Sequence, residues 1–473
     1  MKKNKFIDLL KKLSQTELKS LQKFVDSSYF NLDANCSKLL ALTIPFHPEY
    51  SNQNINKELL FNQLFDQKEY DDKKMRYLFS NTAKLIESFL IQQELNRSPI
   101  QKNTFLLQAL NSRKSDKYFA QHLKKEYETI NQQKTRDRTH YDSLLQLREE
   151  EGKFNAANNN RHLDDSLQQL VYDLEIQSLS KKLRYYCELV NRQNVLAKSY
   201  DLQFMDANIK LAQHGFFKDV PIVSIYYQIL MTLTEGENEH HYYQLKGLIE
   251  NNLALFPQPE LRDMYAFAQN YCIKQINNGK ENFLRELFNI YQILLEQEII
   301  FDNGELAHFD FKNIITVAIR LQELHWVDNF ITHYQARLNP KLKENSVNFN
   351  KAKLCYTRKE FKQSRKLLLT TEFTDVYYHL DAKILLLKTY YDLGDIEPLL
   401  SLLETVKVYL RRNKLVSDYQ RITYLTFLRF LKILVKLQLG SPISAEATLE
   451  KLKNTTQVAD STWLREKLEE WVN

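Results

Sequence analysis

The sequence predicts an all-α protein: an alpha-alpha superhelix, in which helical hairpins stack in a right-handed array, with a small helical domain at the N-terminus. Three observations predict this fold class. Glycine and proline are rare, apolar residues recur every three to four positions, and a spacing of 35 residues repeats in the C-terminal third. The first disfavours sheets, the second predicts amphipathic helices, and the third predicts that the helices come in repeated pairs.

Composition supports long helices with few sharp turns. The 473 residues include only 8 Gly and 9 Pro, well below the share of these residues in average globular proteins. Both residues punctuate sheets, and closely spaced glycines form phosphate-binding loops. The chain is too long for one compact core, so several domains or an extended repeat array are expected.

The sequence contains no segment that is long and apolar enough to span a membrane. The apolar run 384–387 is bounded by Lys383 and Lys388, far short of the roughly 18 residues that a span needs. The lysine-rich N-terminus begins like a signal peptide, but Asp8 and Lys11 interrupt its apolar stretch. We therefore expect a cytoplasmic protein with no membrane partner.

Cysteine spacing indicates neither a disulfide framework nor a metal site. The four cysteines are far apart and form no CxxC pair. Isolated cysteines of this kind are commonly buried as small apolar residues. We expect that role for Cys36, Cys187, Cys272 and Cys355.

The excess positive charge lies in the N-terminal third. Residues 1–150 hold 25 Lys and Arg against 19 Asp and Glu, whereas the remainder holds 40 of each. A basic segment can bind phosphate or an acidic protein surface. Acidic residues interleave the basic ones here, which also fits an ordinary solvated helix face.

Residues 1–95 are predicted to form the small helical N-terminal domain. Ser14 and Glu17 form a capping box at a helix start. Residues 29–48 are aromatic and proline-containing and are read as an irregular connection. A basic helix follows residues 67–72, and its apolar face is predicted at Met75, Leu78, Phe79, Ala83, Ile86, Phe89 and Leu90. The segment could be a cap on the helical array or a winged-helix-like module.

Residues 96–310 are predicted to be irregular helical hairpins. The asparagine-rich segment 151–160 carries a lone glycine and is the best candidate loop, at the point where the basic excess ends. Gly279 marks a clear turn between two apolar helical stretches. Prolines elsewhere fall between helical stretches, where they are tolerated.

Residues 311–473 carry the repeat and end in a predicted capping helix. Trp326, Phe361 and Ile396 are spaced 35 residues apart, and Tyr356 and Tyr391 keep the same register. Each copy reads as a helix, a short polar turn and a second apolar helix, so these residues and Gly394 are predicted to pack the repeats. Trp463 and Trp471 are predicted to close the last exposed apolar face.

This pattern resembles the tetratricopeptide repeat, whose period is about 34 residues. The closest copy is 388–396, where two tyrosines end the first helix and Gly394-Asp395 make the turn. Ser364 replaces the small alanine of the family, and Asn329 and Leu399 depart from it. The sequence is also similar to an uncharacterised bacterial family of long all-helical proteins. The resemblance implies a protein-binding array and brings no catalytic residue or cofactor.

Residue patterns for catalysis or cofactor binding are not found. Single scattered glycines exclude the phosphate-binding loops, and no HExxH motif occurs. His240 and His241 are adjacent, so on a helix they point about 100° apart and read as a polar helix start. His308 with Asp310, and His162 with Asp164, lack a nucleophile beside them. The sequence predicts no enzyme and no cofactor.

Five Tyr-Tyr doublets are predicted to pack mainly in the core, although tyrosine also favours interfaces. Two functions remain open. The leading one is a non-catalytic scaffold or adaptor that binds a peptide or protein in the groove of the array. The alternative is a regulator that binds nucleic acid through the basic N-terminal third and senses a partner through the repeats.

Overall fold

The computed structural model describes residues 4–50, 55–65, 69–158, 166–196, 198–373 and 375–472. These residues form 23 α-helices and four 3-10 helices and no strand, so the predicted all-α class is confirmed. The chain forms two compact units, Met1–Lys181 and Lys182–Asn473, which are described separately below. The division at residues 95 and 310 stays a prediction.

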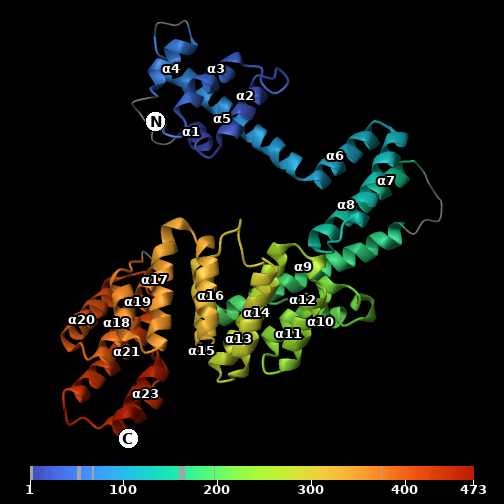
Figure 1. Cartoon of the computed structure of the whole chain (residues 1–473). Coiled ribbons are helices and arrows are strands. Elements are labelled where there is room, and N and C mark those ends of the chain that lie inside the picture. Colours follow the sequence, from blue (N-terminus) through green and yellow to red (C-terminus); the bar gives the residue numbers. More distant parts are fainter. Residues whose placement is uncertain are drawn as a thin grey trace. The chain divides into compact units, whose positions relative to one another are not determined.

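Five helices gather at the start of the first unit (Figure 1, blue) around a shared apolar core. They are α1 (Lys5–Leu10), α2 (Gln15–Val25), α3 (Ala34–Thr43), α4 (Lys57–Leu64) and α5 (Asp72–Arg97). The predicted capping box is present, since Ser14 accepts from the Glu17 N–H and Glu17 accepts from the Ser14 N–H. Six of the seven residues predicted for the apolar face of α5 are buried, and Leu90 is half-buried.

Helix α3 corrects the prediction of an irregular connection over residues 29–48. Asp33 caps its N-terminus by accepting from the Asn35 N–H. Cys36, Leu39 and Leu40 then form a buried face that packs against α5. The prediction missed this ten-residue helix because it has only one apolar stripe and is flanked by proline and aromatic residues, which are typical of irregular segments.

The rest of the first unit consists of α6 (Pro99–Ser112), α7 (Asp116–Gln132), α8 (Arg138–Ala157) and the first part of α9 (Ser166–Leu196). The segment 151–160 was predicted to be a loop, but α8 continues through Gly152 to Ala157. A Cβ atom added at Gly152 would meet no other atom within 4 Å, so the helix tolerates glycine there but does not require it. Residues 159 and 160 lie outside the described part.

The second unit is built from successive helix pairs. Its helices are the rest of α9, α10 (Met205–Ala212), α11 (Pro221–Thr234), α12 (Glu239–Asn251), α13 (Gln258–Asn277), α14 (Asn282–Glu296), α15 (His308–Arg320), α16 (Leu324–Tyr334), α17 (Pro340–Thr357), α18 (Phe361–Leu369), α19 (Val376–Leu393), α20 (Ile396–Arg412), α21 (Asp418–Gln438), α22 (Ala445–Lys453) and α23 (Ser461–Val472). The first helix of a pair, called a first helix below, also packs on the first helix of the next pair: α11 on α13, α15 on α17 and α17 on α19.

Six hairpin turns share one hydrogen-bond pattern, the Schellman motif. In each, a residue one or two positions after the end of the first helix has positive φ, and the next N–H donates to the carbonyl five residues earlier. Gly279, Gly394 and Gly440 hold the left-handed position in three turns. Lysine or glutamine holds it in the others, at Lys114, Gln322 and Lys359.

The last helix, α23, seals the C-terminal core. Trp463, Leu464 and Leu468 are buried together with residues of α19 and α21. Trp471 is 45% exposed, and its indole Nε1 donates to the Tyr391 hydroxyl over 3.2 Å. Of the two tryptophans predicted to close this face, Trp463 is therefore the one that fills it. No helix in the described ranges has the length and apolar character needed to cross a membrane.

Candidate functional site: a lysine pocket

Three lysines from three first helices converge on one pocket of the second unit. Lys312 lies on α15, Lys353 on α17 and Lys388 on α19. The cavity they line has a volume of about 330 Å³. Thr316 is one turn from Lys312 on α15, so the two side chains share one face of that helix. Asp381 is two turns from Lys388 on α19, and these two likewise share a face.

Two of these lysines form ion pairs. The Lys312 Nζ lies 2.7 Å from the Asp381 Oδ2, and the Lys388 Nζ lies 2.9 Å from the Asp460 Oδ2. Both lysine side chains are largely buried, with 15% and 13% exposed. The Tyr424 hydroxyl of α21 donates to the other oxygen of Asp381 over 3.1 Å, so this carboxylate is held from two helices.

Lys353 is the exception, because its ammonium meets a neutral hydroxyl. Its Nζ donates to the Thr316 Oγ1 over 2.8 Å. Burial lowers the pKa of Lys353 from 10.5 to about 8; Asp381 and Asp460 oppose this shift, and Lys388 and Lys312 add to it. The pocket thus holds a lysine that titrates unusually near neutral pH.

Asp460 closes the pocket from the segment before α23. Its φ of 47° is left-handed, a strained conformation for a residue other than glycine. Burial alone would raise its pKa, but the Lys388 ammonium and then Lys353 outweigh that effect and lower the pKa overall. Its carboxylate therefore stays charged as the partner of Lys388.

The sequence reasoning missed this pocket, although a signal for it was present. Lys353 and Lys388 are 35 residues apart, which is the spacing of the predicted repeat. Each interrupts an apolar helix face between buried neighbours. A charged residue that recurs at the repeat spacing on the first helices indicates a shared surface.

The predicted repeat-packing residues lie at three different hairpins. Trp326 is half-buried in α16 and stacks on Phe330, with ring centroids 5.1 Å apart. Phe361 and Ile396 are the first residues of α18 and α20. Measured from the left-handed turn residue, Leu324 and not Trp326 is the equivalent of Phe361 and Ile396, because the first turn comes two residues earlier.

The remaining predicted residues, Tyr356, Tyr391 and Gly394, lie close to the pocket or to the end of α19. Tyr356 contacts two residues of α19: the Lys388 Nζ is 5.2 Å from its ring centroid, and its hydroxyl donates to Asp392. Tyr391 is buried and meets Trp463 edge to face at 5.6 Å. Gly394 ends α19 with a φ of 74°.

The Tyr-Tyr doublets were predicted to pack mainly in the core, and four of the five have at least one buried ring. Tyr226, Tyr242 and Tyr378 are fully buried. Their neighbours are more exposed, and Tyr243 keeps 46% of its surface. In the doublet at 390/391 both rings are buried, whereas in the doublet at 185/186 Tyr185 is 53% exposed and Tyr186 is half-buried.

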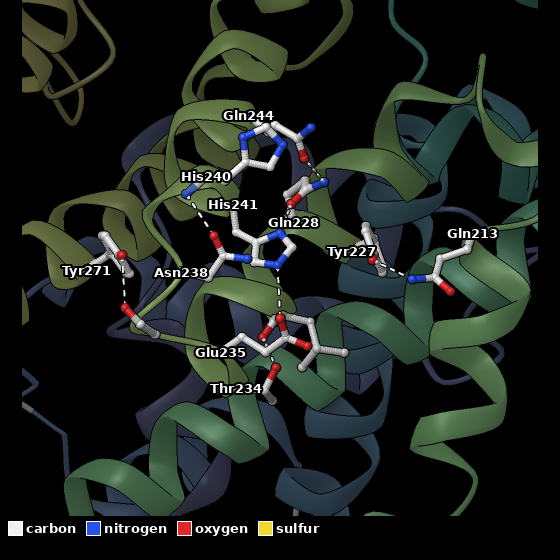
Figure 2. A network of polar contacts seen from close by, with 12 residues as sticks. Gln213, Tyr227, Gln228, Thr234, Glu235, Asn238, His240, His241, Gln244 and Tyr271 are labelled. Carbon is white, nitrogen blue, oxygen red and sulfur yellow. Dashed lines mark hydrogen bonds and ion pairs between the residues drawn. The ribbon is translucent and has the colours of Figure 1, made fainter.

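The adjacent histidines lie in the first turn of α12, as predicted. Figure 2 shows the His241 ring between Gln228 and Glu235. Its Nδ1 lies 2.9 Å from the Gln228 Oε1, and its Nε2 lies 3.2 Å from the Glu235 Oε2. The His240 ring is tilted 54° from it, with centroids 6.4 Å apart. The pair belongs to a polar network that joins α11 to α12 and does not converge on one point.

The two His–Asp pairs considered in the sequence analysis differ in what the structure describes. His308 stacks on Tyr378 at 5.6 Å, while burial raises the pKa of Asp310 against the opposing effect of Arg262. His162 and Asp164 lie outside the described residues. In the part that is described, no three His, Cys, Asp or Glu side chains gather as metal ligands would. All four cysteines are free; three are buried, and Cys355 is half-buried.

The basic N-terminal third is partly neutralised by its own acidic residues. Lys5 pairs with Glu87 at 2.5 Å, and Asp72 pairs with Lys57 at 3.2 Å and Arg76 at 2.8 Å. Lys5, Lys57, Arg76 and Glu87 line a cavity of about 510 Å³. Pairing lowers the positive potential that the residue count alone suggests.

Comparisons with protein-family models, with curated protein sequences and with solved structures found no significant match to this chain.

Proposed function

We propose that the chain is a non-catalytic cytoplasmic adaptor whose second unit, a tetratricopeptide-like helical superhelix, binds a peptide or protein segment. One observation carries the proposal: three consecutive first helices present lysines to one solvent-accessible pocket. A pocket shared by successive repeats is the kind of surface on which helical arrays bind extended partners. The partner segment would carry a negatively charged group.

The pocket has chemistry suited to recognition. Lys312 and Lys388 are oriented by ion pairs with Asp381 and Asp460, so the positions of their charges are set before a partner arrives. Phe349 and Leu385 add apolar contact area beside them. Charge complementarity would set the choice of partner, and the apolar surface would add affinity.

Affinity capture from native lysate tests this function. The full-length chain is compared with Lys353→Met and with a matched control, Lys362→Met, on α18, which contributes no residue to the pocket. A protein partner that survives nuclease treatment and is lost only in Lys353→Met supports the adaptor. Equal capture by all three chains contradicts the role of the pocket.

A second candidate, a nucleic-acid-binding regulator, is favoured by one surface of α5. Lys73, Arg76 and Lys84 are exposed at helical spacing around Tyr77, whose side chain is 68% exposed. Basic residues around an exposed aromatic ring are suited to a single strand of nucleic acid.

The double variant Lys73→Glu with Lys84→Glu separates the two candidates. Fluorescence anisotropy with labelled single-stranded DNA and RNA is measured at several salt concentrations. Salt-dependent binding that this variant loses and Lys353→Met keeps would favour the regulator. Absence of binding in the wild type removes this candidate.

A further inference from the structure

The charges of the pocket do not balance. Three ammonium groups face two carboxylates, and each carboxylate already pairs with one lysine. Within the described residues, no acidic group lies within ion-pair distance of Lys353. One positive charge is therefore left without a counter-ion inside a partly desolvated cavity.

Charged and titratable groups surround Lys353 from every side of the pocket. Lys312 approaches from α15, Asp381 and Lys388 from α19, Tyr424 from α21 and Asp460 from the segment before α23. Each carboxylate is already ion-paired with another lysine, Asp381 with Lys312 and Asp460 with Lys388, and the Tyr424 hydroxyl donates to Asp381. What the pocket offers a ligand is thus N–H donors.

The hydrogen-bond capacity of Lys353 points the same way. An ammonium has three N–H donors, and Lys353 directs one to the Thr316 hydroxyl. The Asn313 side-chain amide also lines the cavity and can donate. A carboxylate or phosphate oxygen suits these donors, whereas a metal cation would meet a net positive charge.

We propose that the pocket binds one oxyanion, the carboxylate or phosphate group of a ligand, on the Lys353 ammonium, and that this binding takes up a proton in mildly alkaline solution. The inference rests on the proposed function in naming the group that a partner segment would insert. An anion beside an amine favours its charged form, and by linkage protonation favours the anion. Burial has already brought the pKa of Lys353 to about 8, so the coupling falls in an accessible range.

Small anions bound to the full-length chain provide the test. Sulfate is the main probe because it does not itself titrate between pH 6 and 10. Calorimetric titrations at pH 8, in buffers of different ionisation enthalpy, give the number of protons taken up. We expect about 0.5 proton per sulfate at pH 8 and up to about a tenfold loss of affinity per pH unit above that.

Three variants connect the result to Lys353. Lys353→Arg keeps a permanent charge and should bind sulfate with no proton uptake and no loss of affinity up to pH 10. Lys353→Met should lose binding, and Lys362→Met should behave like the wild type. Circular dichroism spectra show whether each variant is folded.

Comparing methyl phosphate with acetate at pH 7 decides between the two sources of the oxyanion. Tighter binding of one identifies its group as the ligand class. Sulfate affinity that is equal at pH 7 and pH 9 in the wild type, or sulfate binding retained in folded Lys353→Met, overturns the inference.

Failure of the inference and failure of the adaptor are distinguishable. Partner capture that is lost in Lys353→Met, with no proton uptake on oxyanion binding, overturns the inference and leaves the adaptor standing. Proton-linked sulfate binding without any captured partner supports the inference alone.

Discussion

Lys353 shows how one residue can cost stability in a position that suits binding. Its ammonium is partly desolvated and lies close to two other lysines, and its nearest hydrogen-bond acceptor is the neutral Thr316 hydroxyl. An unpaired charge in such surroundings destabilises the folded state. Residues with strongly shifted pKa values often mark functional sites for this reason.

We predict that Lys353→Met raises the free energy of unfolding at pH 7 by about 1 to 2 kcal/mol, a range that allows for partial solvent screening. The pKa of Lys353 is about 8 in the folded state and near 10.5 when unfolded. Between these values the unfolded state holds the extra proton, so wild-type stability rises with pH and the advantage of the variant shrinks. Denaturant titrations at pH 7 and pH 10 measure both values; an advantage that grows with pH would contradict the assignment.

His140, in the first unit, should act as an acid-sensitive residue. It is 5% exposed, and burial, with a smaller effect of Arg136 opposed by Asp137, lowers its pKa from 6.5 to about 4. The unfolded state binds the proton first, so stability falls as the pH drops from 6.5 to 4, by up to about 3 kcal/mol. We predict that His140→Phe flattens this acid limb.

The measurement for His140 uses the position of the fluorophores. All three tryptophans, Trp326, Trp463 and Trp471, lie in the second unit. Acid unfolding of the first unit should therefore appear in circular dichroism without a matching change in tryptophan fluorescence. The half-buried His122 of α7 provides the control variant His122→Phe, which should leave the acid limb in place.

At the scale of elements, the hairpins depend on the left-handed turn residue. Gly394 and Lys359 occupy the same place in consecutive turns, with φ of 74° and 63°. Glycine adopts this conformation freely, whereas a side chain costs about 1 kcal/mol there. Lys359 and Gly394 are 35 residues apart, which is the predicted repeat spacing.

We predict opposite effects at these two turns. Gly394→Ala should lower the free energy of unfolding by about 1 kcal/mol, and Lys359→Gly should raise it by about 0.5 kcal/mol. Gly247→Ala, inside α12 with open space around it, is the matched control and should be stabilising. Thermal and denaturant unfolding of the full-length chain give the three values. A destabilised Lys359→Gly would show that its side chain matters more than the turn.

At the scale of the whole molecule, each compact unit contains its own clusters of buried apolar residues. In the second unit α23 covers the final face, where Trp463 meets Tyr391 and Phe427. The Lys467 Nζ also lies 2.9 Å from the Asp392 Oδ1 and ties α23 to the end of α19. Because Asp460 begins this closure, the same segment that seals the core completes the lysine pocket.

Two tryptophans of α23 make a matched pair for testing the closure. Trp463→Ala should cost about 3 to 5 kcal/mol because a buried aromatic side chain is deleted. Trp471→Ala should cost about 1 kcal/mol, since it is 45% exposed and loses mainly one hydrogen bond to Tyr391. Tryptophan fluorescence during denaturation reports the second unit in both variants. Equal losses would mean that α23 does not close the core through Trp463.

The sequence by itself determined the all-α class, the capping box at Ser14, the apolar face of α5 and the turn at Gly279. These features depend on residues close together in the chain, where propensity, capping and periodicity act directly. Local signals were insufficient at α3 and in α8, where proline, aromatic and asparagine residues mimic loops although packing maintains a helix.

Only the tertiary structure decided the lysine pocket. Lys312, Lys353, Asp381 and Asp460 come from separate elements, and their partners are set by how α15, α17 and α19 pack. The pKa of a lysine depends on burial and on charges brought near it by folding, and neither can be predicted from its neighbours along the chain. The repeat spacing of Lys353 and Lys388 marked the helices involved, but folding was needed to show which amine is left without a counter-ion.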